Sequence, residues 1–139
     1  MSADRPEIGT IAWRDLTVEN ATEIRDFYTA IVGWKSDEVE MGGYCDFNMI
    51  PPGSDEAAVG ICHARGSNTD LPAQWLLYFV VDSVDQSAAR CVELGGAIVS
   101  PPRAMDGGRF CVVRDPAGAI CALYSAPPAG APAGAPAED

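Results

Sequence analysis

The sequence contains one histidine, His63, and its five cysteines form no Cys-x-x-Cys or similar pair. A structural zinc site needs thiolates paired closely along the chain, usually together with histidine. Because this chain offers neither, we expect no structural zinc site and interpret the cysteines as reduced thiols that act as small core residues. They are Cys45, Cys62, Cys91, Cys111 and Cys121.

Positive charge and long apolar runs are also scarce. Nine Lys and Arg stand against twenty Asp and Glu, which gives a formal net charge of −11. This charge repels nucleic-acid phosphates and anionic lipids, and no apolar run approaches the ~20 residues of a membrane span. The opening residues, MSADRPEIG, lack the basic and apolar segments of a signal peptide. We therefore expect a cytoplasmic protein that binds neither nucleic acid nor membranes.

The length of 139 residues suits one domain. Residues 126–139, APPAGAPAGAPAED, repeat Ala, Pro and Gly and offer no apolar surface to bury. Proline also lacks the amide donor that a helix or strand uses. The sequence therefore predicts one folded domain over residues 1–125, followed by a disordered tail over residues 126–139.

Two helices are predicted from capping residues and apolar periodicity. The first begins after Asn20, with Glu23 as reciprocal capping partner, and ends at Gly33. Its inward stripe comprises Ile24, Phe27, Tyr28 and Ile31. The second begins after Ser83 and ends at Gly95-Gly96. Its inward residues are Val84, Ala88, Cys91 and Leu94.

Strand-like runs surround both helices and are separated by Gly- and Pro-containing turns. They cover residues 10–18, 44–50, 57–63, 75–81, 97–100, 109–114 and 119–125. The capping residues are 83 − 20 = 63 positions apart, and the helix-ending glycines are 96 − 33 = 63 apart. One strand–helix–strand–strand unit thus occurs twice. A ferredoxin-like βαββαβ sandwich is the alternative, but it needs two strands between its helices, whereas we count three.

Five motifs in the second half occur in an order and spacing that resemble the vicinal oxygen chelate superfamily. They are VDSVD (81–85), ELGG (93–96), SPP (100–102), GGRF (107–110) and RDPAG (114–118). FYTAIVGW (27–34) matches in the first half. This superfamily includes glyoxalase I, bleomycin resistance proteins and extradiol dioxygenases. The resemblance implies an α+β fold of two βαβββ modules, about residues 8–66 and 73–125, each a curved half-barrel sheet with its helix on the convex side.

Alternation along residues 44–50 assigns side chains to the two faces of such a sheet. The apolar set, Cys45, Phe47 and Met49, suits the helix-covered face. Asp46 and Asn48 then lie on the concave face, and Trp13 and Asp15 share one face of the first strand.

The resemblance also implies where a divalent metal would be held, by four side chains that are usually His or Glu. Carried over by motif, the positions are Trp13, Gly60, Leu76 and Ala122. None of these side chains can ligate a metal. We therefore expect no metal or other cofactor. His63 is interpreted as a hydrogen-bonded histidine at a strand end, and a relocated metal site with Asp46 or a neighbouring cysteine is the alternative.

We expect the concave face to bind a small molecule, because it combines apolar and aromatic residues with a few polar groups. Its expected residues are Trp13, Asp15, Asp46, Asn48, Cys62, Leu76, Tyr78 and Ala122, with Arg109 near the rim. In the alternative, Trp13 and Leu76 merely fill the hollow of the half-barrel. Asp15 and Asp46 could form an acid/base pair if they lie close together.

Three functional classes remain open. The first is a metal-free protein that binds a small aromatic or amphipathic ligand, and the second is a lyase, isomerase or dioxygenase of the same superfamily. The third is an assembly subunit whose pocket has no function. The sequence identifies no catalytic residue. We expect a homodimer, because open half-barrels leave strand edges that need covering.

Overall fold

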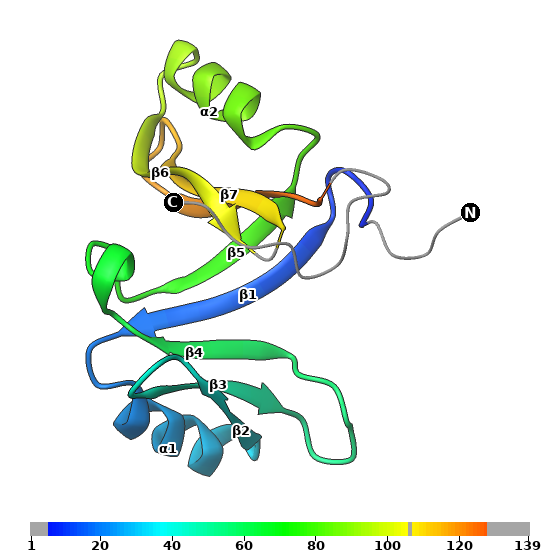
Figure 1. Cartoon of the computed structure of the whole chain (residues 1–139), viewed down its shortest axis with the longest axis vertical. Coiled ribbons are helices and arrows are strands. Elements are labelled where there is room, and N and C mark those ends of the chain that lie inside the picture. Colours follow the sequence, from blue (N-terminus) through cyan, green and yellow to red (C-terminus); the bar gives the residue numbers. More distant parts are fainter. Residues whose placement is uncertain (1–5, 106, 128–139) are drawn as a thin grey trace. The chain divides into compact units, whose positions relative to one another are not determined.

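A computed structural model describes residues 6–105 and 107–127 of the chain. It divides into two compact units (Figure 1). One unit is Trp13–Leu76, and the other comprises, within the described residues, those up to Ala12 and those from Leu77 onward. The first and second modules follow this division, except that the opening strand of each module begins before the boundary between the units. The predicted tail, residues 126–139, lies outside the described residues except for its first two.

The first module is a βαβββ unit. Its elements are β1 (Ile11–Val18), α1 (Ala21–Val32), β2 (Lys35–Glu40), β3 (Cys45–Ile50) and β4 (Val59–His63), followed by a short 3-10 turn (Gly66–Asn68). Strand β2 pairs antiparallel with β3, and β3 pairs antiparallel with β4. Strand β4 then pairs in parallel with β1, the strand that opens the module.

The second module repeats this arrangement. Its elements are β5 (Trp75–Val80), α2 (Val84–Glu93), β6 (Ala97–Met105), β7 (Gly108–Arg114) and β8 (Ile120–Ser125). Again the second strand pairs antiparallel with the third and the third with the fourth, and the fourth pairs in parallel with the first. The predicted α+β fold of two βαβββ modules is thereby confirmed, and the ferredoxin-like alternative is wrong.

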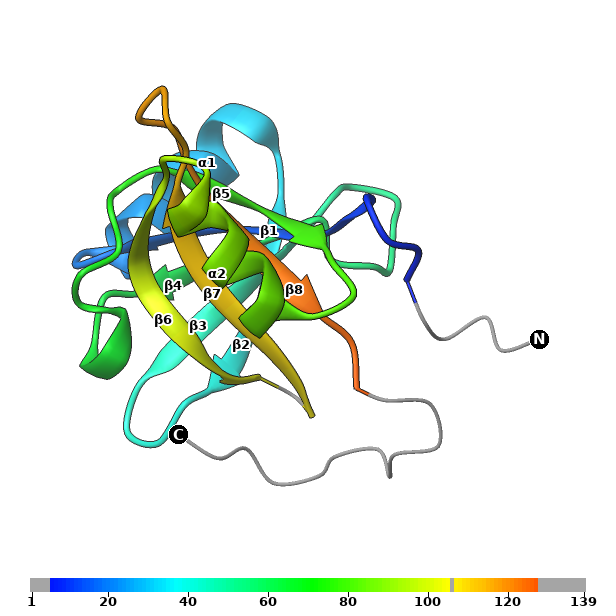
Figure 2. The ribbon, with the colours of Figure 1, turned by 90° about the horizontal axis from the view of Figure 1, so that it is seen from above.

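Each helix covers one face of the sheet in its own module. In the first module, Ala21 of α1 is fully buried against Phe47, Met49, Val59 and Ile61. In the second, α2 lies over β6 and β7 (Figure 2). Val84 and Ala88 of this helix pack against Cys111 and Val113. Burial of these side chains supplies the main hydrophobic stabilisation of both modules.

The helix boundaries agree with the sequence, while some details differ. Ser83 Oγ accepts the Gln86 N–H at 3.2 Å, as predicted. Asn20 instead donates its side-chain amide to the Glu23 carboxylate at 3.1 Å and caps no backbone N–H. Gly33 ends α1 at φ 90°, a left-handed conformation that favours glycine.

Three of the predicted inward residues are exposed. Phe27 and Ile31 of α1 are 52% and 61% exposed, and Leu94 after α2 is 64% exposed. Only the narrower stripe, Ile24 and Tyr28 on α1, packs on the core. Twelve and ten residues long, neither helix of the described chain is long and apolar enough to cross a membrane.

Candidate functional site

The face of the first-module sheet opposite α1 carries the polar residues that the sequence placed together. Asp15 of β1 and Asn48 of β3 are both register partners of Gly60 on β4. Thr17 of β1 is the partner of Cys62, two residues further along β4. Residues two apart point to the same side of a strand. This face therefore includes Trp13, Asp15, Thr17, Asp46, Asn48, Gly60 and Cys62.

Trp13 lies directly against Gly60. A methyl group added at Gly60 would be 3.3 Å from Cζ2 and 3.4 Å from Nε1 of the Trp13 indole, and 3.4 Å from Asp15 Cβ. Such distances are tighter than ordinary carbon–carbon contacts. The indole therefore occupies the space that a side chain at position 60 would need.

Asp46 is the most heavily hydrogen-bonded group of this face. Its Oδ1 accepts the backbone N–H of His63 at 2.8 Å and lies 3.2 Å from His63 Nδ1. Asp46 also lies close enough to Cys62 to raise the pKa of that thiol. The interpretation of His63 as a hydrogen-bonded histidine at a strand end is confirmed.

Cys62 is held as a neutral thiol. Burial raises its pKa most strongly, and the nearby carboxylates of Asp15 and Asp46 raise it further. Because the thiolate is the nucleophilic form of cysteine, this environment is unsuited to nucleophilic catalysis. Asp15, only 8% exposed, is buried on the same face as Cys62.

In the second module, the sheet face opposite α2 is more apolar. Tyr78 of β5 pairs in register with Ala122 of β8, and both are buried. The Tyr78 ring lies 6.1 Å from the Phe110 ring, and the Arg103 guanidinium lies 4.6 Å above Phe110. The sequence analysis missed Phe110 and Arg103. Alternation from Cys111 along β7 could have found Phe110, but Arg103 lies beyond the predicted end of its strand.

Arg109 does not lie on that face. It alternates with Phe110 along β7, and its guanidinium makes two hydrogen bonds, of 2.8 and 3.0 Å, to the Asp85 carboxylate on α2. This places Arg109 on the helix-covered side of the second-module sheet. The expectation of a position near the rim of the concave face is therefore wrong.

Leu76 is an expected site residue on β5. It is 1% exposed, whereas its neighbour Trp75 packs in the opposite direction, on the α1 side. Trp75 Nε1 donates a hydrogen bond of 3.2 Å to Tyr28 Oη, and its ring lies 6.2 Å from Trp34. Trp75 is therefore a core residue of the first module.

Among residues 6–105 and 107–127, no three His, Cys, Asp or Glu side chains are arranged to hold a metal ion. The positions carried over from the superfamily, Trp13, Gly60, Leu76 and Ala122, supply an indole, a hydrogen atom and two hydrocarbon groups. A hard divalent cation prefers carboxylate oxygen or imidazole nitrogen. These four residues do not fit such an ion.

The sequence was compared with protein families and curated proteins. The model of the Glyoxalase/Bleomycin resistance protein/Dioxygenase superfamily matches residues 8–122. A protein named as glyoxylase CFP32 from Mycobacterium bovis is 31% identical, covering 88% of this chain and 46% of the relative. The anthracycline biosynthesis protein DnrV from Streptomyces peucetius is 33% identical, covering 84% of this chain and 46% of the relative. The chain thus spans about half the length of these curated relatives.

Solved structures share the fold at lower sequence identity. A methylmalonyl-CoA epimerase, solved with methylmalonyl-CoA and ammonium, superposes with a TM-score of 0.54 at 18% identity, covering 91% of this chain and all of that one. The corresponding enzyme from Mycobacterium tuberculosis gives 0.52 at 18% identity, covering 92% and 94% of the two chains. At this identity the similarity concerns the fold alone.

Proposed function

The chain belongs to the Glyoxalase/Bleomycin resistance protein/Dioxygenase superfamily, and from this premise we propose that it binds a small aromatic or amphipathic molecule without the metal of its metal-dependent relatives. The observation that carries the proposal is the contact between Trp13 and Gly60. The Trp13 indole occupies one of the positions expected to supply a metal ligand. It also packs against Gly60, which is a second such position. An aromatic surface thus takes the place of ligating atoms.

The chemistry of the first-module face supports this choice of ligand. Trp13 offers a stacking surface, and Asn48 on the same face offers an amide that can form hydrogen bonds. An aromatic or apolar surface with a few polar groups is the usual composition of a small-molecule site. Two relatives are named for anthracycline biosynthesis. An anthracycline is therefore a reasonable first probe, and the identity of the natural ligand is left open.

Metal analysis tests the first half of the proposal. The purified protein should contain less than stoichiometric nickel, zinc, iron or manganese. Adding these ions should leave its melting temperature unchanged, because an ion stabilises a protein only by binding the folded state better than the unfolded one. One tightly held transition metal per chain would contradict the proposal and would favour the metal-dependent enzyme.

Ligand titration tests the second half. An anthracycline should raise the melting temperature and quench Trp13 fluorescence. Trp13→Ala should weaken binding severalfold, because a stacked aromatic pair contributes ~0.5–1.5 kcal/mol beyond its buried area. Trp75→Phe is the matched control, since Trp75 packs against Tyr28 on the α1 side of the sheet. It should leave the affinity unchanged. Equal losses in both variants would argue against binding at Trp13.

The alternative of a metal-dependent lyase, isomerase or dioxygenase with a relocated metal near His63 is not favoured. Asp46, the nearest carboxylate, is already engaged by the backbone N–H and the ring nitrogen of His63. Cys62 keeps its proton under ordinary conditions because its pKa is raised. A metal would have to displace these hydrogen bonds before it could bind. We further propose that the protein is cytoplasmic, from its composition, and that it forms a homodimer, from the superfamily resemblance.

A further inference from the structure

His63 and Asp46 form a hydrogen-bonded pair at the end of β4. The pair is largely shielded from solvent, with side-chain exposures of 16% for His63 and 11% for Asp46. The β3–β4 ladder runs from Met49↔Val59 to Phe47↔Ile61. Beyond it, the Asp46 carboxylate accepts the N–H of His63, two residues after Ile61 on β4. The backbone and the ring of His63 are thus both anchored to one carboxylate oxygen.

This anchoring selects one tautomer of the imidazole. Asp46 Oδ1 accepts the His63 backbone N–H at 2.8 Å, so this oxygen acts as an acceptor. Nδ1, at 3.2 Å from the same Oδ1, must then be the protonated nitrogen of a neutral ring. Nε2 is left with the lone pair, and within the described residues no hydrogen bond occupies it. A carboxylate that orients imidazole in this way also stabilises the imidazolium that forms when Nε2 takes a proton.

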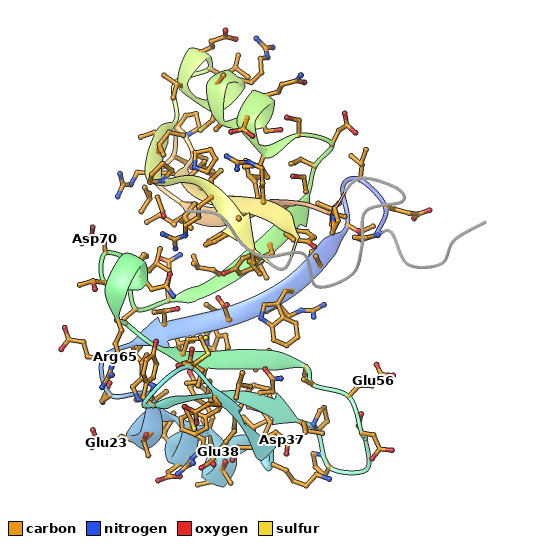
Figure 3. The ribbon with its side chains drawn as sticks, in the orientation of Figure 1. Glu23, Asp37, Glu38, Glu56, Arg65 and Asp70 are labelled. Carbon is orange, nitrogen blue, oxygen red and sulfur yellow. The ribbon has the colours of Figure 1, made fainter. Side chains whose placement is uncertain are left out.

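The surroundings of the ring are aromatic, and an arginine stacks on each of its two aromatic neighbours. His63 packs edge-on against Tyr44 at 5.4 Å and lies 6.1 Å from Phe47. The Arg65 guanidinium stacks on Tyr44 at 4.2 Å, and that of Arg25 stacks on Phe47 at 4.5 Å. Arg65, labelled in Figure 3, follows β4 and is exposed. The Arg25 guanidinium is also paired with the Asp26 carboxylate at 2.9 Å. Arg65 is therefore the cation here that suits a planar molecule developing negative charge.

We propose that Asp46 and His63 form a general-base dyad, in which Nε2 of His63 removes a proton from an activated carbon of a small carbonyl or heteroaromatic compound. In this step the C–H bond breaks, the proton joins Nε2, and the electron pair remains on the substrate as an enolate or expels a leaving group. The proton then passes from the imidazolium to water. His63 is the catalytic residue, and Asp46 is a positioning residue. The proposal goes beyond ligand binding and does not depend on stacking against Trp13.

Nitrogen-15 NMR of the imidazole tests the geometry without a substrate. At a pH where the ring is neutral, wild type should show a protonated Nδ1 and an unprotonated Nε2. Asp46→Asn should change this distribution, because an amide can donate to Nδ1 as well as accept from it. Asp46→Glu should restore at least part of it. A wild-type spectrum with the proton on Nε2 would overturn the proposal.

A Kemp elimination tests the activity, with 5-nitrobenzisoxazole as the probe. A base removes its C3 proton while the N–O bond breaks, giving a coloured cyanophenolate. Because positioned general bases contribute roughly 10²–10⁴-fold, wild type should exceed His63→Ala at least ~10-fold in rate. Asp46→Asn should fall between them. Glu93→Gln, which changes an exposed ion pair with Arg90 on α2, should equal wild type.

The variants also separate this proposal from its rivals. Equal rates for wild type and a folded His63→Ala would overturn it, as would a rate lost in Asp15→Asn but kept in His63→Ala. If His63→Ala does not fold, diethyl pyrocarbonate provides the test, since acylation of the single imidazole in wild type should abolish the rate. A rate that survives acylation would overturn the dyad. Trp13→Ala should keep the rate even if anthracycline binding fails, so the two proposals fail separately.

Discussion

At the scale of single residues, Gly60 is a glycine favoured by the packing of a neighbouring side chain, Trp13, and not by its own backbone conformation. Its φ lies outside the left-handed region, yet a Cβ at this position would lie 3.3 Å from Cζ2 of the Trp13 indole, so the indole would have to shift by a few tenths of an ångström. The contact therefore couples the two residues energetically.

Gly60→Ala should lower the free energy of unfolding by about 1–3 kcal/mol, the usual cost of forcing an extra methyl group into a packed site. Chemical denaturation of wild type, Gly60→Ala, Trp13→Ala and the double variant measures the coupling. In the Trp13→Ala background, the alanine at position 60 should cost much less. An equal cost in both backgrounds would show that the indole does not occupy this space.

Because the Cys62 thiol is buried, the free energy of unfolding should fall as the pH rises into the alkaline range. Its native pKa is raised above the ordinary thiol value, chiefly by burial. The unfolded chain therefore loses this proton first, and the stabilisation present below about pH 8.5 declines as the pH rises toward the native pKa. The decline is at most ~1.4 kcal/mol per pH unit for one thiol.

Denaturant titrations between about pH 8 and about pH 10.5 measure this slope. Cys62→Ala should show a shallower decline than wild type, whatever its stability at neutral pH. Burial also raises the pKa of Cys111 to about 11, so part of the slope should remain. Identical slopes in the two proteins would argue against a buried, protonated Cys62.

At the scale of elements, the outermost strand in each module's pairing order resists addition of another strand. Strand β2 presents exposed charges, among them Asp37 and Glu38, which Figure 3 labels. Strand β6 contains Pro101 and Pro102 and has register shifts around them. Charge, proline and irregular register are known protections of strand edges. We therefore expect a dimer to use a surface other than these two edges.

The ion pair between Asp85 and Arg109 joins the first turn of α2 to β7. Asp85→Ala should lower the unfolding free energy by about 0.5–1 kcal/mol, because it removes a two-bond contact and an acidic group near the helix N-terminus. Both partners are substantially exposed, which keeps the effect small. Glu93→Ala, which breaks the single-bond exposed pair with Arg90, is the control and should cost less. Thermal melts of both variants provide the measurement.

At the scale of the whole molecule, negative charge is unevenly distributed along the chain. Residues 13–76 carry 11 acidic and 4 basic residues, a net charge of 4 − 11 = −7 out of the total of −11. The remaining −4 is shared by the rest of the sequence. A second copy would therefore bring like charges together if the first modules faced each other, so we expect contacts elsewhere to dominate in a dimer.

Light scattering at low micromolar concentration should give a particle of about twice the 14.6 kDa chain mass. Glu38→Lys, which changes the charge on the edge of β2, should leave that mass unchanged. A 14.6 kDa particle would contradict the homodimer. A change of mass in the variant would instead assign the interface to β2.

The sequence by itself determined the two helices, the repeat and most strands, because caps, turns and apolar periodicity act over a few residues. Its residue pattern missed β2, since KSDEVE is too charged to show a buried face and is held by its pairing with β3. It also ended β6 at Ser100, because two prolines normally stop a strand, whereas an outermost strand tolerates them. The alternation of side chains along residues 44–50 placed Asp46 and Phe47 on opposite faces of the sheet, and Phe47 packs on the α1 side as expected.

Only the tertiary structure decided which side chains meet. It directed Trp75 into the core beside Tyr28, Arg109 to Asp85 on α2, and the Trp13 indole to Gly60. It also joined Asp46 to His63, 17 positions away in the chain. These contacts depend on strand register and on the rotamers that packing selects, and neither quantity can be read from a local pattern.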